Sequence, residues 1–188
     1  SILMHSSLLK RYTHLRQHSL NLAAPLSAED QCVQSMPDTS PTKWHLAHTS
    51  WFFENLVLLP FLPGYKVFDA SFSYLFNSYY EALGPRHPRP QRGLLTRPAL
   101  SQVLAFRQHV DTFMQQLLSN TDALNEQSLA LIELGMNHEQ QHQELLLTDA
   151  LHLLSCNPQL PAYNRSFAHP SAYSAESKWL SFEEGLTT

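Results

Sequence analysis

Residues 138–144 read His-Glu-Gln-Gln-His-Gln-Glu, inside an apolar, periodic stretch from about Leu129 to Leu154. Residues four apart in an α-helix lie about 40° apart around the axis and about 6 Å apart along it, so His138 and His142 are expected on one face. Two imidazoles on one face suit a divalent metal ion. Glu144 follows His142 by two residues, about 200° around the axis, so it is not expected to reach the same ion. A third ligand must come from another segment.

Helical periodicity marks four segments of the chain, whereas strand signals are thin. The expected helices cover about Ser7–Leu22, a run to Pro60 with Ser40 as N-cap and Pro41 as first residue, a segment that follows Arg97-Pro98 and ends near Ser119-Asn120, and Leu129–Leu154. Four amphipathic helices of this length favour an antiparallel bundle, whose core commonly holds metal sites built from facing helices. The predicted fold is therefore all-α, an antiparallel four-helix bundle.

Two stretches do not fit the bundle. Residues 61–96 form a long loop after the second helix, with an arginine cluster at Arg86, Arg89, Arg92 and Arg97. A connection of this length is unusual unless it is functional or disordered. Residues 156–188 lose the helical period and are predicted to be an irregular tail, so the bundle domain is expected to cover residues 1–155.

The composition is that of a globular, mildly acidic protein. A formal charge of −4 with 15% charged residues gives no indication of nucleic-acid binding. Cys32 and Cys156 lie far apart, which fits a reducing compartment and excludes a thiolate zinc site. The N-terminus lacks signal-peptide features, and the best apolar run, residues 56–62, is interrupted by Pro60. We therefore expect a cytoplasmic protein without a membrane span.

The fourth helix places both motif histidines at core positions. Residues with the 4-3-4-3 spacing of a bundle seam are Leu131, Gly135, His138, His142 and Leu145. Two histidines on this face favour metal ligation over ordinary buried histidines. His48 and His45 are both candidates for the third ligand, and the seam-like spacing of His48 with Trp44, Trp51 and Asn55 favours His48. The sequence leaves open whether His45 supports a ligand or is exposed. Weaker candidates for the third ligand are Asp149, His152 and His109.

The sequence His138-Glu139-x-x-His142 also matches the zinc-protease signature, in which the glutamate is the general base. That reading needs a further ligand downstream, and a candidate such as Glu176 lies in the non-helical tail, so we disfavour it. Three neutral imidazoles would leave open coordination positions, as catalytic sites do. Zinc, iron and nickel all accept imidazole, so the ligand set does not select the metal.

Three blocks in the same order resemble one family. These are residues 40–54 (SPTKWHLAHTSWFFE), 76–93 (FNSYYEALGPRHPRPQRG) and 138–144 (HEQQHQE). Over about residues 5–188 the chain is similar to the N-terminal DinB-like domain of the ergothioneine-pathway sulfoxide synthases. The resemblance implies a DinB-like four-helix bundle in a non-haem iron(II) enzyme. Such an enzyme uses oxygen to join a thiol, cysteine or γ-glutamylcysteine, to the imidazole ring of hercynine, giving a sulfoxide.

The resemblance also implies roles for single residues. The family's three-histidine facial triad falls on His48, His138 and His142. Gln141 matches a position that helps to hold the hercynine imidazole. Two arginines three apart hold the carboxylate of the thiol substrate, and Arg86/Arg89 and Arg89/Arg92 both have this spacing; we favour Arg89 and Arg92. Glu139 and Glu144 belong to the motif as supporting or structural groups.

The family's enzymes carry a second, C-terminal domain of the formylglycine-generating type, which completes the active site and supplies the catalytic tyrosine. The present sequence stops where that domain would begin. We therefore expect this polypeptide to bind metal, to contain no catalytic residue of its own and not to form the sulfoxide alone. The alternatives are a free-standing DinB-like metal-dependent thiol transferase or hydrolase, with zinc or nickel, and a structural bundle whose histidines belong to the core.

Overall fold

The computed structural model describes residues 2–78 and 80–163, and every regular element within these ranges is helical. The four long helices are α1 (Ile2–Ala23), α2 (Thr42–Phe53), α5 (Leu100–Ser119) and α6 (Glu126–Ser155). Short elements occupy the connections: η1 (Asp30–Cys32), η2 (Glu54–Leu58), α3 (Leu59–Phe61), α4 (Phe72–Leu75), η3 (Glu81–Leu83), η4 (Arg89–Leu94) and η5 (Thr121–Ala123). The predicted all-α four-helix bundle is confirmed.

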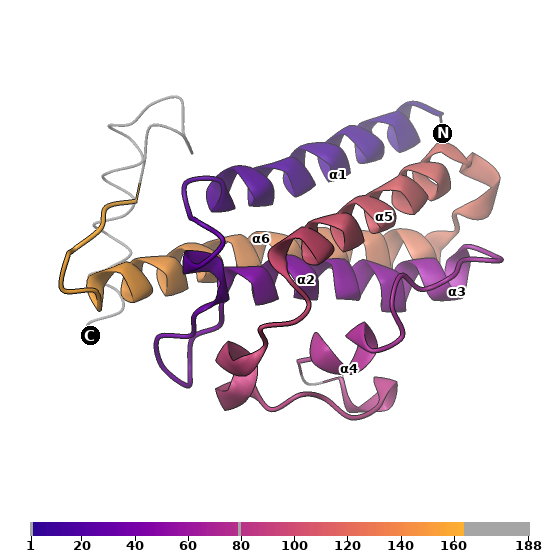
Figure 1. The fold of residues 1–188 in the computed structure, drawn as a ribbon. Helices are drawn as coiled ribbons and strands as arrows, with labels where there is room; N and C mark the ends of the chain where they lie inside the picture. The colour runs from indigo at the N-terminus through magenta and orange to yellow at the C-terminus, as the bar shows by residue number, and fades with distance from the viewer. Residues whose placement is uncertain (1, 79, 164–188) are drawn as a thin grey trace.

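The order of the helices explains the long connection after α2. Helices α1 and α6 run one way along the bundle, and α2 and α5 run the other way (Figure 1). Helices α1 and α2 each pack against both α5 and α6 and so lie at opposite corners of the bundle. Because α2 and α5 are parallel, the chain must return along the bundle between them. The described residues of the segments 62–78 and 80–99 make that return and cover one side of α2 (Figure 1).

The start of α2 differs from the prediction. The helix begins at Thr42, its N-cap is Pro41, and no side chain caps it. The Ser40 hydroxyl instead accepts a hydrogen bond of 2.8 Å from Arg92 Nη1. The predicted N-cap at Ser40 is therefore wrong, because an arginine of the long connection uses that hydroxyl.

The end of the α2 run contains a π-helical turn, η2. Pro60 has no N–H group, and its ring collides with the carbonyl four residues earlier in a regular α-helix. The turn before it is wider: Leu59 N–H donates to Glu54 O, five residues back. The helical run then continues through α3 to Phe61, close to the predicted limit at Pro60.

Gly135 allows α6 to approach α2 closely. A Cβ atom at this position would lie 2.6 Å from Phe53 Cε1 and 3.0 Å from Phe52 Cε1, too near for either buried ring. Glycine is therefore the residue that fits this crossing. The close approach brings His138, almost one turn further along α6, against α2.

The buried face of α6 is rotated relative to the predicted seam. Its buried residues include Ile132, Gly135, Met136, Glu139, Gln143, Leu146 and Ala150. Leu145, which was expected at the seam, is 40% exposed, so that prediction is wrong. The face turns towards Glu139 and Gln143, whose polar groups have hydrogen-bond partners on α1. His138 and His142 lie at the edge of this face, half-buried.

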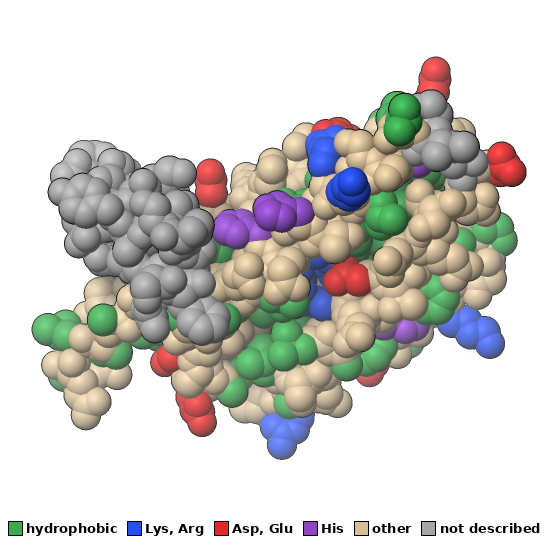
Figure 2. All heavy atoms as spheres, turned by 90° about the horizontal axis from the view of Figure 1, so that it is seen from above, with side chains coloured by type: hydrophobic (Ala, Val, Ile, Leu, Met, Phe, Trp, Pro, Cys, Tyr) green, Lys and Arg blue, Asp and Glu red, His purple; other side chains and the backbone are tan. Residues whose placement is uncertain are grey.

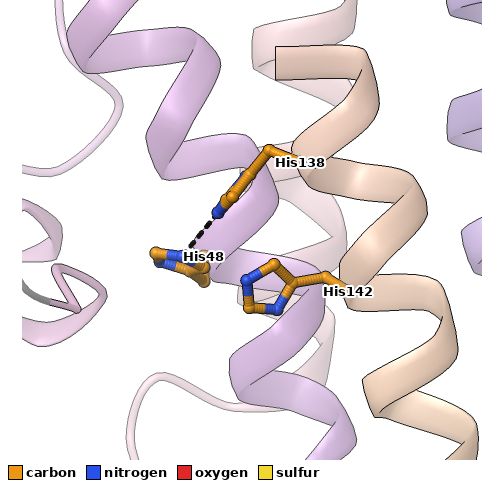
Figure 3. A group of neighbouring side chains, drawn as sticks. All are labelled: His48, His138 and His142. Atoms are coloured by element: carbon orange, nitrogen blue, oxygen red, sulfur yellow. Dashed lines mark hydrogen bonds between the residues drawn. The ribbon is translucent and has the colours of Figure 1, made fainter. Parts of the chain in front are cut away.

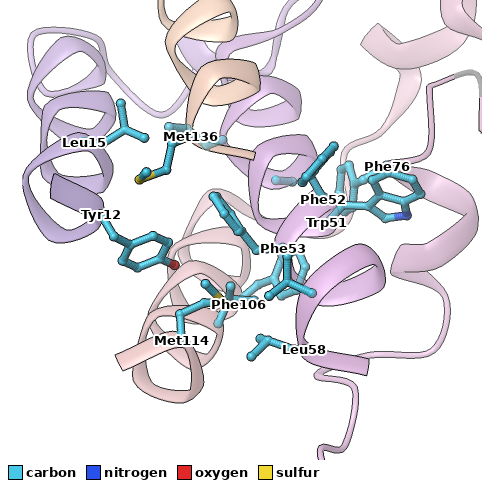
Figure 4. Close-up of a cluster of buried hydrophobic side chains, with 14 of the residues drawn as sticks. Tyr12, Leu15, Trp51, Phe52, Phe53, Leu58, Phe76, Phe106, Met114 and Met136 are labelled. Carbon is cyan, nitrogen blue, oxygen red and sulfur yellow. The ribbon is translucent and has the colours of Figure 1, made fainter. Parts of the chain in front are cut away.

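The core combines aromatic side chains with one ionic network. Figure 4 shows Phe53 of α2 among side chains from the other long helices, including Tyr12, Phe106 and Met136, whereas Trp51 lies beside Phe76 of the long connection. Beside them the Glu139 carboxylate accepts hydrogen bonds from Arg16 at 2.9 Å, Arg107 at 3.1 Å and Ser19 at 2.6 Å. This network ties α1, α5 and α6 together.

Charged side chains of both signs are scattered over the described part of the face shown in Figure 2, without a broad basic patch there. Among the described residues, no helix is both long and apolar enough to cross a membrane. The predicted tail begins where α6 ends, at Ser155, and residues 156–163 contain no helix or strand. The rest of the predicted tail, with Glu176, lies outside the described residues.

Candidate metal centre

Helix α2 supplies His48 from the centre of the bundle. Every residue of α2 is buried, because the bundle covers two sides of the helix and the long connection covers another. His48 is fully buried, and its Nδ1 donates a hydrogen bond of 2.6 Å to the carbonyl of Phe76 in that connection. A carbonyl can only accept, so the neutral ring carries its proton on Nδ1 and has a lone pair on Nε2.

Helix α6 supplies the two motif histidines. His48 Nε2 lies 3.1 Å from His138 Nε2, and one nitrogen from each of His48, His138 and His142 lies within 4.8 Å of the other two (Figure 3). Nitrogens bound to one ion at about 2.1 Å lie roughly 3.0–3.4 Å from each other. The cluster therefore fits a metal ion after a small movement of the His142 ring towards the other two histidines. Nδ1 of His138 is buried and has no hydrogen-bond partner among the described residues.

The surroundings keep all three imidazoles neutral. Burial, reinforced by the neighbouring His138, holds the pKa of His48 well below its usual range. Burial lowers the pKa of His138 to about 4. Burial and the nearby His48 also lower the pKa of His142. Neutral imidazole is the form that binds metal, so the cluster is ready for ligation near pH 7.

Aromatic rings fix the orientation of the ligands. The His48 ring stacks on Trp44, with centroids 4.5 Å apart and planes at 12°, and also faces Trp51 at 5.6 Å. His138 stacks on Phe52 at 4.7 Å. These contacts restrict rotation of both imidazoles and keep water away from one side of the cluster.

His45 and Asp149 lie directly behind His142. His45 Nδ1 is 3.0 Å from His142 Nδ1, and His45 Nε2 is 2.8 Å from Asp149 Oδ2. Of the two roles left open for His45, the structure therefore shows the supporting one, with the ring only 3% exposed. From the sequence, Asp149 is only a weaker candidate for a metal ligand, and its supporting contact with His45 is not predicted. Its spacing of seven residues from His142, two helical turns on one face, is the sequence signal for this role.

The glutamates of the motif do not face the cluster. Glu139 is fully buried and bound to Arg16 and Arg107, so its carboxylate is not available as a base beside the histidines. This arrangement contradicts the zinc-protease reading. Glu144 is exposed on α6.

Three arginines of the predicted cluster, Arg86, Arg89 and Arg92, line a pocket of about 490 Å³ together with Ser78, Pro88 and Pro90. Arg92 is buried and lies 3.5 Å above the Trp44 ring. Its Nε has no hydrogen-bond partner among the described residues. Arg89 is exposed and donates to Asp38 O at 2.6 Å, and Arg86 is exposed. Trp44 stacks on both Arg92 and His48, so its ring lies between the buried arginine of the pocket and the histidine cluster.

Gln141 lies on the exposed side of α6, one residue before His142. Its contact with a substrate stays a prediction. The same holds for the arginines, although the structure brings all three to one pocket.

The family assignment agrees with this geometry. The model of the DinB superfamily matches residues 11–146, a range that contains the three histidines and the arginine cluster. The chain therefore belongs to the DinB superfamily, and within that fold it holds a buried three-histidine cluster that could bind a metal ion. No curated protein matches the chain.

Proposed function

We propose that this chain is the metal-binding domain of an iron(II)- and oxygen-dependent sulfoxide synthase, which joins cysteine or γ-glutamylcysteine to hercynine in ergothioneine biosynthesis. The observation that carries the proposal is that Trp44 packs between His48 of the three-histidine cluster and Arg92 of the arginine-lined pocket. The substrates named in the proposal are inferred from the resemblance of three sequence blocks to the sulfoxide synthases. One oxygen molecule balances the reaction: the C–S bond replaces an S–H and a ring C–H bond, one oxygen atom goes to sulfur and the other to water.

The residues would divide the work as follows. His48, His138 and His142 would hold the ion, and the bound iron would supply open coordination positions and redox chemistry with oxygen. Three neutral ligands leave the charge of a divalent ion uncompensated, which favours an anionic partner such as a thiolate. Arg92, with Arg89 or Arg86, would bind the carboxylate of the thiol substrate. Trp44 and Phe52 would keep water from the ligand rings.

A free-standing DinB-like metal-dependent thiol transferase or hydrolase is the second candidate. The family match extends only to the superfamily, and three imidazoles suit zinc or nickel as well as iron. This candidate also uses the histidines and an anionic thiolate, but it has no use for hercynine.

Metal analysis of protein purified without added metal tests the site. We expect one metal ion per chain, lost in His48→Ala and in His142→Ala and kept in His14→Ala, an exposed histidine on α1. Absence of stoichiometric metal, or metal that survives both ligand substitutions, would remove the site.

Calorimetry on the anaerobic, iron(II)-loaded protein separates the two candidates. The sulfoxide synthase predicts binding of hercynine and of cysteine, with hercynine binding weakened in Gln141→Ala. Binding of thiols alone, equally with zinc and iron, would favour the transferase or hydrolase.

A further inference from the structure

A hydrogen-bonded pair, His45 and Asp149, lies behind His142, and no backbone hydrogen bond of the His142 ring is seen among the described residues. Asp149 Oδ2 accepts the Ser40 N–H at 2.9 Å and lies 2.8 Å from His45 Nε2. His45 Nδ1 in turn lies 3.0 Å from His142 Nδ1. His45 is 3% exposed, so water has little access to these contacts. The pair thus connects the beginning of α2 to α6 immediately behind the cluster.

Only one arrangement of protons satisfies this chain when both rings are neutral. An ionised carboxylate only accepts, so His45 carries its proton on Nε2. Its Nδ1 then holds a lone pair and accepts from His142 Nδ1–H. His142 is left with a lone pair on Nε2, the atom that can bind a metal ion.

The hydrogen bond that sets the tautomer of His142 differs from the one that sets the tautomer of His48. There the Phe76 carbonyl sets the tautomer by itself, because it can only accept. The neighbour of His142 is another imidazole nitrogen, which can either donate or accept. The direction of the His45–His142 hydrogen bond therefore depends on Asp149.

We propose that Asp149 and His45 are positioning residues that hold His142 in the tautomer and orientation for metal binding, and thereby raise the metal affinity of the cluster. The inference rests on the proposed three-histidine site and is independent of which metal or substrate the protein uses. Groups behind metal-ligating histidines commonly contribute about 10–100-fold to metal affinity.

Zinc affinity, measured by competition with a chromophoric chelator, tests the pair. We expect zinc to bind about 10–100-fold more weakly to His45→Phe and to Asp149→Ala than to the wild type. His45→Asn keeps an acceptor at the place of Nδ1 and should recover most of the loss. His109→Phe is the matched control, because this half-buried ring also packs among aromatic residues, Tyr65 and Phe113, but outside the cluster. Thermal unfolding without metal checks that each variant folds. If His45→Phe does not fold, the zinc affinity of Asp149→Ala decides the test.

Nitrogen NMR of the zinc-loaded wild type gives a readout that a merely structural role would not produce. We expect protons on Nδ1 of His142 and Nε2 of His45, and redistribution of the His45 proton in Asp149→Ala. Wild-type zinc affinity in folded His45→Phe and Asp149→Ala, or a proton on His142 Nε2, would overturn the positioning role. Zinc that survives His48→Ala would instead overturn the metal site itself, so the two failures are distinguishable.

Discussion

Arg16 Nη1 donates a hydrogen bond of 2.9 Å to Glu139 Oε1, so the acidic residue of the His-x-x-x-His motif is bound to α1 and not to the metal cluster. Both side chains are almost completely buried, and Arg107 donates to the other carboxylate oxygen at 3.1 Å. The motif therefore has two functions on two faces of α6. His138 and His142 face α2, whereas Glu139 joins α1 and α5 to α6.

Glu139→Gln is expected to lower the free energy of unfolding by about 3–5 kcal/mol, because it removes the anion that Arg107 pairs with and leaves the buried Arg16 with Asp111 alone. Urea unfolding of the metal-free protein measures the change. Glu144→Gln, the same substitution at an exposed position of α6, should change it by no more than about 0.5 kcal/mol. A loss below about 1 kcal/mol in Glu139→Gln would show that the network contributes little.

The same carboxylate predicts a loss of stability in acid. Burial alone would raise the pKa of Glu139, but Arg16 and Arg107 hold it at about 2. The unfolded chain has an ordinary glutamate, with a pKa of about 4.3, and so binds more protons in this interval. The stabilisation is therefore complete above about pH 5 and is lost as the pH falls towards 2, by roughly 3 kcal/mol in all.

Urea unfolding in the presence of a chelator, repeated between pH 6 and pH 2.5, measures this dependence. The decrease of the unfolding free energy with falling pH should persist in Glu144→Gln. A wild-type unfolding free energy that stays constant over the range would contradict the ion pairing.

Gly135→Ala is expected to destabilise the bundle although alanine favours helix. The new Cβ would lie 2.6 Å from Phe53 Cε1, and overpacking of this kind costs about 1–3 kcal/mol, against a gain in helix propensity of about 1 kcal/mol. Since α6 would have to move away from α2, zinc affinity should fall together with the unfolding temperature. Ala130→Gly, at an exposed position of α6, is the matched control for helix propensity and should leave zinc affinity unchanged. Unchanged stability and zinc affinity in Gly135→Ala would show that the Phe52 and Phe53 rings can move to accommodate the new Cβ.

The long helices followed from the sequence because apolar spacing reports directly which positions of a helix are buried. Helix α5 ends at Ser119, as expected, and α6 extends only slightly beyond the predicted range. The spacing of His138 and His142, with the position of His48 on a second helix, likewise predicts the three-histidine cluster.

Contacts between charged residues far apart in sequence did not follow from periodicity. Arg16 and Arg107 each look like residues for the solvent side of a helix, and only the packed bundle shows that both reach Glu139. For the same reason the buried face of α6 was predicted with Leu145 rather than Glu139. The Ser40 hydroxyl satisfied the local rule for an N-cap, but the distant Arg92 donates to it.

Arg92 is the arginine that we expect to matter most for carboxylate binding. Burial, with Arg89 and Arg86 nearby, lowers the pKa of Arg92 to about 9, so the group is still a cation near pH 7 and would gain from a nearby anion. Its unpartnered Nε gives that anion a donor. Hydrogen bonds to charged groups contribute about 1.5–3 kcal/mol, so Arg92→Gln should weaken cysteine binding to the metal-loaded protein by about 10–100-fold.

Cysteamine, which lacks the carboxylate, isolates this contribution in calorimetry. The wild type should bind cysteine more tightly than cysteamine, and Arg92→Gln should remove most of that preference. Arg97→Gln, an exposed arginine after η4 whose guanidinium donates to Thr96 O, should retain it. Equal affinities of the wild type for the two thiols would exclude carboxylate recognition by the pocket. An equal loss in both variants would point to general electrostatic attraction, because a specific contact requires the buried position of Arg92 beside Trp44.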